Sequence, residues 1–366
     1  MSSTMDWVVA RKKGSAWGTA VAVGALSGVK IESEGIPPGI PEPIVDANVG
    51  DVLAQGNYQG NVSLEGPVVV PVRYLGFERD LALFMGQDTV TQVAGETIAY
   101  QHEMIFQASI ASLFATWVMN KGLGNTRLHE YPSCKYGSLD LMHGEGKLKA
   151  SIGLIADRCV RASGVNGATE MNAVTYPTTA LLALFNHLTL KLKAVTGTEG
   201  NLAPGDEYKV TDAKLTCNRN VSGDHESGSN AGYIGEPDTD GFPEAQLVLN
   251  FANYTTLLDD LIKEAQIRQT ASEPKVYKAT LAWTGKSIPA SVVPTPYQLI
   301  VDFAALHVAT APMNAGSPGA RVPIEITFNI VAPQVAPNGS DWSWCAVGSK
   351  PYRARLINTN SVSALA

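Results

Sequence analysis

Residues 324–330 alternate strictly between apolar and polar side chains, and this alternation limits the possible structure more than any other feature of the chain. The run reads Ile-Glu-Ile-Thr-Phe-Asn-Ile. Successive side chains of a β-strand point to opposite faces, so the four apolar groups share one face. Burying each of them contributes about 1.5–3 kcal/mol. The run therefore predicts a strand with one face on a core and the other in water.

The same alternation recurs along the chain. Residues 148–156 and 188–194 alternate in the same way, with lysines among their polar positions. Further strands are expected at residues 99–108, 114–119, 211–217, 245–251, 278–284 and 298–309. Trp117 and Trp283 fall within two of these runs and are expected to be buried. The sequence predicts a mainly β protein.

Two segments break the period of two. From Tyr74 the apolar residues fall three or four positions apart as far as Phe84, and Gly86 stands where a helix would end in a left-handed residue. In the second half of the chain, Thr256 is expected to cap a helix whose third position is Asp259. Its apolar stripe consists of Leu257, Leu258, Leu261, Ile262 and Ala265.

Each expected helix follows an apolar strand and precedes a pair of strands, which predicts a duplicated plan. We divide the chain on this basis into an N-terminal arm with a long loop (1–61), a first β domain (62–160), a connecting segment with its own strand (161–206), a second β domain (207–332) and a C-terminal extension (333–366). A chain of 366 residues is long enough for two such domains.

The net charge of −7 is unevenly distributed. Two stretches, 31–72 and 220–262, contain no Lys or Arg but many acids. The acids that we consider as contact residues are Glu32, Glu34, Glu42, Asp224, Glu226, Glu236, Asp238, Asp240 and Glu244. Because the basic residues lie outside these two stretches, opposite charges are segregated along the chain. Such segregation favours head-to-tail association between copies of a chain. The alternative is that these stretches are solvated loops.

The C-terminal extension contains two tryptophans, Trp342 and Trp344, and two arginines, Arg353 and Arg355. Large aromatic groups are rarely left in water without a covering surface. These four residues form a second expected contact.

Motifs for chemistry are absent from the sequence. The six histidines never fall at zinc-ligand spacing, and no nucleophile elbow occurs. The acids around Asp238 lack the glutamate that a calcium loop requires at its twelfth position, where Leu247 stands. The four cysteines are scattered, which is typical of reduced residues. We therefore expect no catalytic residues, no cofactor and no metal.

The sequence also disfavours membrane insertion and secretion. No run of 18 or more apolar residues occurs, so no membrane-spanning helix is expected. Residues 11–26 loosely resemble a signal peptide, but Asp6 precedes the basic residues and Gly and Ser dilute the apolar stretch.

Several segments taken in order resemble the tail tube (major tail) proteins of long-tailed bacteriophages. They are Trp-Gly-Thr-Ala at 17–20, the helix from Tyr-Leu-Gly-Phe at 74–77 to Leu-Phe-Met-Gly at 83–86, Tyr-Pro-Ser-Cys at 131–134, the hairpin 139–148, the strands 210–220 and 247–251, and the closing strand 323–328. The resemblance covers nearly the whole chain. The extension after Pro333 is longer than the family leads us to expect.

The resemblance implies β-sandwich or barrel domains with a flanking short helix, assembled into stacked rings that form a conduit for DNA. Three duplicated chains would close a pseudo-hexameric ring, whereas chains without duplication would need six copies. The implied partners are further copies of the chain, the tape-measure protein, the tail tip and terminator proteins, and genomic DNA in passage. The implied location is the virion tail, assembled in the host cytoplasm. The acidic stretches would line the lumen or join rings.

Three other functions would each require different features of the chain. A β-sandwich binding module of the carbohydrate-binding or adhesin type would require an aromatic platform. A capsid-associated structural protein is close to the tail tube in sequence character. A hydrolase would require carboxylates or a histidine converging in a cleft.

Overall fold

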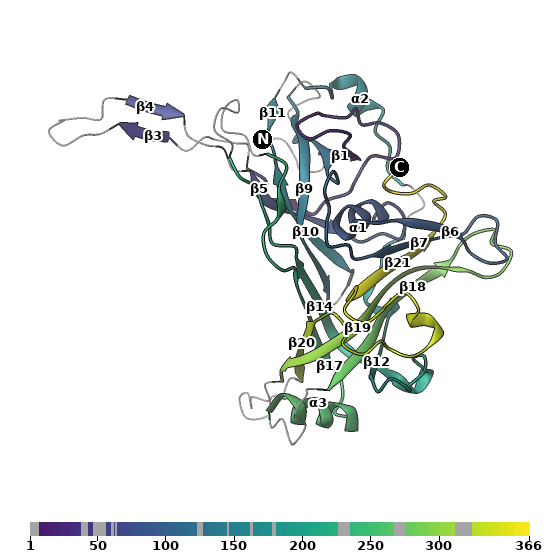
Figure 1. The fold of residues 1–366 in the computed structure, drawn as a ribbon. Coiled ribbons are helices and arrows are strands. Elements are labelled where there is room, and N and C mark those ends of the chain that lie inside the picture. The colour runs from purple at the N-terminus through teal and green to yellow at the C-terminus, as the bar shows by residue number, and fades with distance from the viewer. Residues whose placement is uncertain are drawn as a thin grey trace, which may run out of the picture.

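The computed structural model describes residues 7–37, 43–46, 56–59, 62, 64–122, 127–144, 146–161, 164–177, 181–225, 235–266, 275–311 and 324–366. Within them the protein is mainly β, as the alternation predicted. Its antiparallel strands form two sets, which lie one above the other in Figure 1.

The first strand set occupies the upper half of Figure 1. Its strands pair in the order β1–β8–β9–β10–β5–β2. They are β1 (Val8–Lys13), β8 (Ala115–Asn120), β9 (His129–His143), β10 (Lys149–Ala156), β5 (Glu65–Pro71) and β2 (Ser33–Glu34). The basic residues 11–13, which in sequence loosely resembled the start of a signal peptide, belong to β1.

The second strand set repeats this order of pairing as β12–β18–β19–β20–β17–β14. Its strands are β12 (Leu188–Ala194), β18 (Val276–Ser287), β19 (Pro296–Thr310), β20 (Glu325–Ile330), β17 (Glu244–Phe251) and β14 (Val210–Asn218).

The connections of the two sets also correspond. Helix α1 (Glu78–Met85) follows β5, and helix α3 (Thr256–Gln266) follows β17. A two-stranded hairpin, β3 (Pro43–Asp46) with β4 (Gly56–Gln59), lies in the chain between β2 and β5. The pair β15 (Val221–Ser222) and β16 (Asp238–Thr239) lies between β14 and β17.

Among the described residues, the two sets pair directly with each other at one place. At this place, called here the β9–β14 joint, residues 138–143 of β9 pair with residues 213–218 of β14. β21 (Tyr352–Asn358) pairs with β19 on one side and with β7 (Tyr100–Ile105) on the other, and β7 pairs with β6 (Thr89–Gln92). The C-terminal extension thus supplies a strand that connects the second set to two strands from the first half of the chain.

The smaller elements lie outside these strand sets. β11 (Val160–Arg161) pairs with β9, and β13 (Glu207–Tyr208) pairs with β12. The helix α2 (Ala168–Asn172) and short 3-10 turns at residues 185–187, 204–206 and 340–342 complete the described elements.

Both expected helices are present, with shifted starts. Helix α1 ends at Gly86, which has the predicted left-handed conformation (φ 89°). It begins at Glu78 and not at Tyr74, because residues 74–77 form turns in which Gly76 has φ 99°. In α3 the capping hydroxyl belongs to Thr255, which accepts from the amide of Leu258 at 3.3 Å, one residue before the predicted cap.

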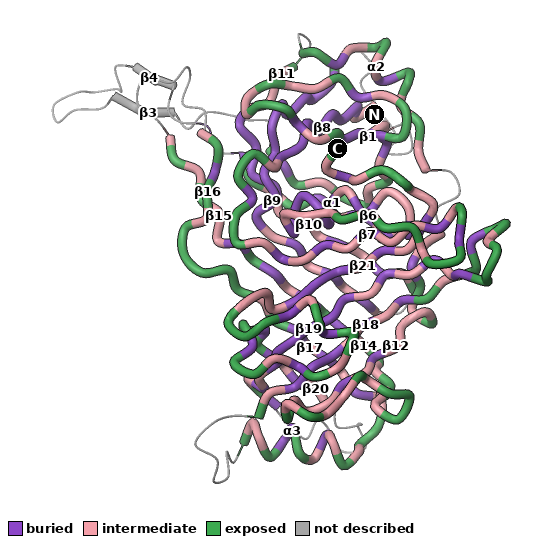
Figure 2. Tube along the Cα trace, turned by 45° about the vertical axis from the view of Figure 1, so that its right-hand side comes forward, coloured by how far each residue is buried: buried purple, intermediate pink, exposed green. Residues whose placement is uncertain are grey.

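The core runs through both sets without interruption. Trp117 and Trp283 are both buried, as expected, with 0% and 1% of their surface exposed. All the strands predicted from alternation are present, with bounds that differ by a few residues. Figure 2 shows the alternation itself, because buried and partly exposed residues follow each other along β14, β17 and β20.

Candidate assembly surface

One face of the sheet is polar and continuous across both strand sets. The strands β2–β5–β10–β9–β14–β17–β20–β19 pair in uninterrupted succession. In Figure 1 the strands β5, β10, β9, β14, β20 and β17 lie to the left of α1, and β19 crosses toward them from the right. Where these strands pair in this order, their inward residues form the core and most of their outward residues are partly or fully exposed, whereas the first half of β9 is buried on both faces. We call this outward surface the polar face.

Short uncharged side chains predominate on the polar face. One row crosses five strands through consecutive cross-strand partners: Ser151, Asp140, Thr216, Gln246 and Asn329. The amide of Gln246 donates to the side chain of Asn329 at 3.2 Å. Burial raises the pKa of Asp140 despite the opposing charge of Lys214. Apart from Asp140, the row consists of hydroxyl and amide groups.

Two lysines at the edge of the polar face share the carboxylate of one predicted contact residue, Glu32. The Nζ of Lys149 lies 2.8 Å from a carboxylate oxygen of Glu32, and Lys147 contacts the other oxygen. Burial would raise the pKa of Glu32, but the hydrogen bonds from these two lysines outweigh it and lower the pKa. Glu34 is also paired, 2.6 Å from the Nζ of Lys121. Both acids thus have partners inside the subunit.

Glu236, in the second acidic stretch, is likewise bound within the chain. Its carboxylate lies 2.5 Å from the Nζ of Lys135 and accepts from the amide of Ser112 at 2.6 Å. Burial lowers the pKa of Lys135, although Glu236 counteracts this effect. The ion pair fixes the segment before β16 against β9 of the first strand set.

The other acids of the second stretch are exposed. Asp224, Asp238, Asp240 and Glu244 lie on or beside the β15–β16 hairpin or at the start of β17. Glu42 and Glu226 fall outside the described residues. The structure thus divides the predicted acids into an internally paired group and an exposed group. Both groups flank the hairpins that occupy corresponding positions in the two strand sets.

The predicted C-terminal contact residues are packed against their own chain. Trp342 is 2% exposed, and the Nζ of Lys278 lies 5.3 Å from its ring centre. The guanidinium of Arg353 lies 5.0 Å from the ring centre of Trp344. Their contact with a neighbouring copy stays a prediction.

The arginines of this group belong to β21, where they share a carboxylate. Arg353 Nε and an amino nitrogen of Arg355 both lie 2.8 Å from Asp302 of β19. Arg353 also lies 2.7 Å from Glu103 of β7. These ion pairs connect the same three strands that are joined by backbone pairing.

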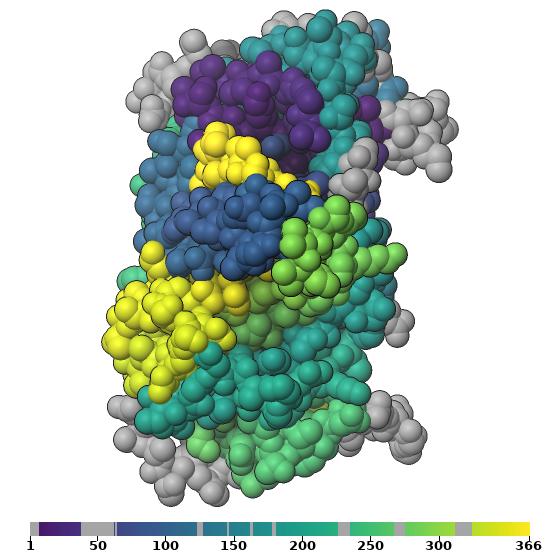
Figure 3. Space-filling model, turned by 90° about the vertical axis from the view of Figure 1, so that its right-hand side faces the viewer, coloured from purple at the N-terminus to yellow at the C-terminus, as the bar shows by residue number. Residues whose placement is uncertain are grey.

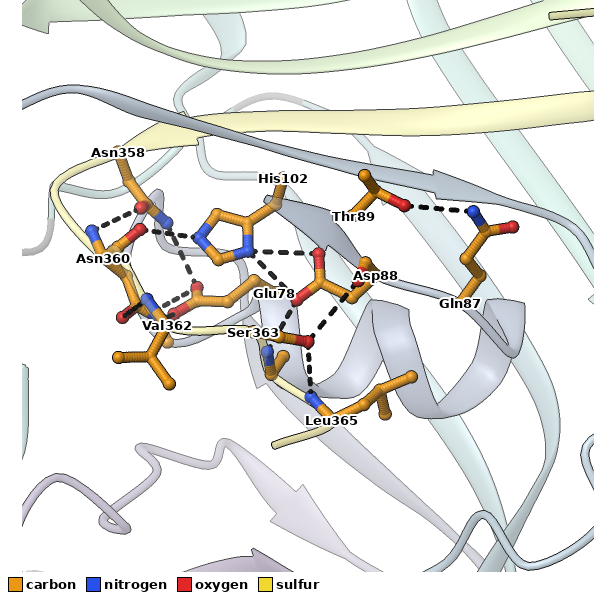
Figure 4. A network of polar contacts seen from close by, with 12 residues as sticks. Glu78, Gln87, Asp88, Thr89, His102, Asn358, Asn360, Val362, Ser363 and Leu365 are labelled. Carbon is orange, nitrogen blue, oxygen red and sulfur yellow. Dashed lines mark hydrogen bonds and ion pairs between the residues drawn. The ribbon is translucent and has the colours of Figure 1, made fainter. Parts of the chain in front are cut away.

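The end of the chain is held beside α1 by a buried polar network (Figure 4). His102 Nδ1 lies 3.1 Å from both carboxylate oxygens of Asp88, and its Nε2 lies 3.0 Å from the carbonyl of Asn360. The amide of Ala364 donates to Asp88 at 2.6 Å. Figure 3 shows this yellow chain end packed between the purple N-terminal segment and the blue region of α1, β6 and β7.

The uncharged polar face was not predicted as a contact surface from sequence. Its signal was present, because these residues are the polar positions of the alternating strands. Clustered charge is visible in the sequence, but Ser, Thr, Asn and Gln in a single strand indicate only a solvent-facing side. They form one surface only when the strands pair.

The described residues contain no group of three or more His, Cys, Asp or Glu side chains that could hold a metal ion. Nor does any described helix have the length and apolar character needed to cross a bilayer.

The sequence model of one protein family, described as phage tail tube protein, matches residues 8–332. This range includes every strand of both strand sets and leaves out β21. The search of curated proteins gave no match.

Proposed function

Because the chain belongs to the family of phage tail tube proteins, we propose that it polymerises into stacked rings that enclose a conduit for DNA. The family is structural and non-enzymatic, and the chain is a structural protein of the phage tail. Ring formation and DNA passage are the parts that we propose here. The observation that carries them is the polar face, which extends across both strand sets.

The chemistry of the polar face suits a DNA channel. Duplex DNA carries one negative charge per about 1.7 Å of its axis, and cationic groups bind it by releasing counterions. A lumen rich in free lysine would hold the DNA. On the polar face Lys149 is paired with Glu32, Lys214 is the exposed lysine of β14, and the central row consists mainly of hydroxyl and amide groups. Such a surface gives phosphates few fixed charges to bind.

The identical order of pairing in the two strand sets supports a duplicated subunit. We propose one unit from β1 to β10 (8–156) and a second from β12 to β20 (188–330). Compared with the units expected from sequence, 62–160 and 207–332, the first gains β1, β2 and the β3–β4 hairpin from the preceding segment, and the second gains β12. Three such chains would then close a pseudo-hexameric ring. The alternative is a ring of six chains.

The exposed acids beside the β15–β16 hairpin are the proposed ring–ring contact or lumen residues. The two roles are separated by a triple variant in which Asp238 and Asp240 are replaced by Asn and Glu244 by Gln. Loss of polymerisation with a folded subunit supports the contact between rings. Intact tubes with altered DNA delivery support a place in the lumen. Normal assembly together with normal delivery would exclude both roles.

The primary experiment is negative-stain electron microscopy of the purified protein across a concentration series. Hollow tubes or stacked rings are expected, and their end views give the ring symmetry. A protein that stays monomeric at every concentration, also when mixed with the tail tip complex, would contradict the proposal. In the infected cell, assembly is proposed to occur in the host cytoplasm with the tape-measure and terminator proteins.

The conduit role has a separate test. Replacing Gln246 and Asn329 with lysine places two cations in the central row of the polar face, at positions whose cross-strand partners include no acid. Tubes should form normally, because both side chains point away from the core, but infectivity per assembled particle should fall. The same two-lysine change at Ser343 and Ala346, which are exposed outside the sheet, is the matched control.

A further inference from the structure

We propose that neighbouring copies join by adding β2 of one copy to the C-terminal end of β19 of the next, in the geometry of the β9–β14 joint. This inference rests on the proposed self-assembly and identifies the surface that would carry it. The partner is a second copy of this chain. The argument depends on the correspondence between the two strand sets, because one of the two equivalent joints is already closed within the subunit.

The correspondence is fixed residue by residue at the strand that leads to each helix. The amide of Val72 donates to Leu148 at 2.9 Å, and the amide of Phe251 donates to Ile324 at the same distance. Preceding them, Val70 pairs with Ala150 as Leu249 pairs with Ile326. Counting residues along each strand from these anchor pairs then gives equivalent positions in the two sets.

The same register relates the strands at the joint. Ser151 pairs with Asp140 in the first set, and the corresponding Thr327 pairs with Thr310 in the second. Thr310 of β19 is therefore the counterpart of Asp140 of β9. Likewise, Ser33 lies opposite Val69 as Lys214 lies opposite Val248, so β2 is the counterpart of β14.

β9 and β19 are the equivalent long strands of the two sets, and each has an edge beyond its pairing with β8 or β18. On β9 this edge is occupied by β14. β8 pairs with β9 from Met119↔His129 only as far as Ala115↔Cys134, and beyond it β14 occupies the same edge from Ser138 to His143. β18 pairs with β19, and the pairing nearest the C-terminal end of β19 is Val276 with His307. Beyond His307, β19 continues to Thr310 with β20 on its opposite edge, and Thr310 is exposed. Among the described residues, no strand occupies the edge past His307.

β2 offers the matching strand. It pairs with β5 on one side, and the described residues include no strand on its other side. Ser33 and Gly35 are exposed there. β2 and the end of β19 are the two outer limits of the polar face, so a head-to-tail pairing would continue the polar face from one copy to the next. Unpaired strand edges invite such pairing, and ring closure removes them.

Cross-linking tests this register. One chain carries Ser33→Cys and another carries Thr310→Cys, both with Cys159→Ser, because the other three cysteines are buried. The two positions are expected to be diagonal neighbours, about 7–8 Å apart, and a bismaleimide of similar span can join them. The matched control is Lys214→Cys with Asp140→Cys in one chain, which has the same diagonal relation across the closed joint.

A covalent dimer between the two single-cysteine chains, formed in tubes but not in dilute subunits, is the expected result. If tubes form and the control cross-links while the test pair does not, the β2–β19 joint is wrong and the proposed function is unaffected. If the wild-type protein forms no tubes, the proposed function itself fails. Should the cysteine chains not assemble, hydrogen exchange of wild-type protein replaces the cross-link. Within residues 33–36 and 308–311, the amides that do not donate to β5 or β20 must then slow at least tenfold on polymerisation, and unchanged rates of these amides would overturn the joint.

Discussion

Arg219 extends from the end of β14 into the first strand set, where its Nε lies 2.5 Å from the carbonyl oxygen of Phe84 in the last turn of α1. A second nitrogen donates to the carbonyl of Gln107 at 2.9 Å, and the guanidinium lies 4.2 Å from the ring centre of Phe106. Burial lowers the pKa of Arg219 to about 10, so the group is charged at neutral pH. A cation in the core thus connects the two halves through backbone carbonyls and aromatic rings.

Replacing Arg219 with methionine should lower the free energy of unfolding by about 2–4 kcal/mol, because two buried carbonyls lose their donors. Urea denaturation of the isolated subunit measures the change. Lys214→Met, at an exposed position of the same strand, is the control and should change stability by less than about 0.5 kcal/mol. Equal midpoints for the two variants would show that Arg219 does not stabilise the fold.

Gly66→Ala should block assembly more than folding. A Cβ at Gly66 would lie 2.8 Å from the amide nitrogen of Ile36 and would overlap the backbone of Gly35. The added methyl group must therefore displace the segment around β2, the proposed docking strand. The expected result is a folded monomer that forms few tubes, measured by circular dichroism and electron microscopy. Gly205→Ala, where a Cβ meets no atom within 4 Å, is the control and should assemble normally.

The chain end should be released as pH rises. Burial would lower the pKa of His102, but the hydrogen bond and charge of Asp88 outweigh it and raise the pKa. Protonated His102 therefore stabilises the network. The stabilisation is complete below about pH 6.5, the pKa of a free histidine, and it is lost as the pH rises through the higher pKa of His102 in the folded protein.

Carboxypeptidase digestion measures this release. Between pH 6 and pH 9, removal of the terminal residues should accelerate relative to a peptide of the same sequence at the same pH. His102→Gln cannot titrate, so its relative rate should be the same throughout. A wild-type rate that does not change with pH would show that protonation of His102 does not hold the chain end.

Glu236→Gln should loosen the segment before β16. The substitution removes the anion beside the buried Nζ of Lys135, and an unpaired buried cation is unfavourable. The amide of Ser112, which donates to Glu236, should exchange hydrogen faster, while amides of the distant β12 should keep their rates. Glu244→Gln, at an exposed position, should leave the Ser112 amide unchanged; equal exchange in the two variants would contradict the role assigned to the ion pair.

The strands that sequence predicted well are those with one solvent-facing side, such as β20 and β12. β9 was only partly anticipated, through the hairpin after Leu139, because its first half is buried on both faces. Cys134, Lys135 and Tyr136 are consecutive and all fully buried, so no alternation marks this segment. β21 was not predicted, since Arg353 and Arg355 were interpreted as contact residues of a C-terminal extension. Their carboxylate, Asp302, belongs to a strand far away in sequence.

The candidate site was predicted in part for the same reason. Charge segregation along the chain identifies acids near the two hairpins, but it does not show that Glu32, Glu34 and Glu236 have lysine partners. Those partners are brought near by strand pairing across long stretches of chain. The polar face likewise exists only once β9 and β14 meet.

The position of β21 sets the order in which the protein can mature. Arg353 and Glu103, partners across the β21–β7 pair, are 250 residues apart in the chain. On the ribosome, β7 emerges well before β21 and gains this neighbour only after the residues between them have been translated. Contacts of such long sequence separation form late and slowly. Until β21 has been made, β7 therefore lacks the strand that pairs it with β19.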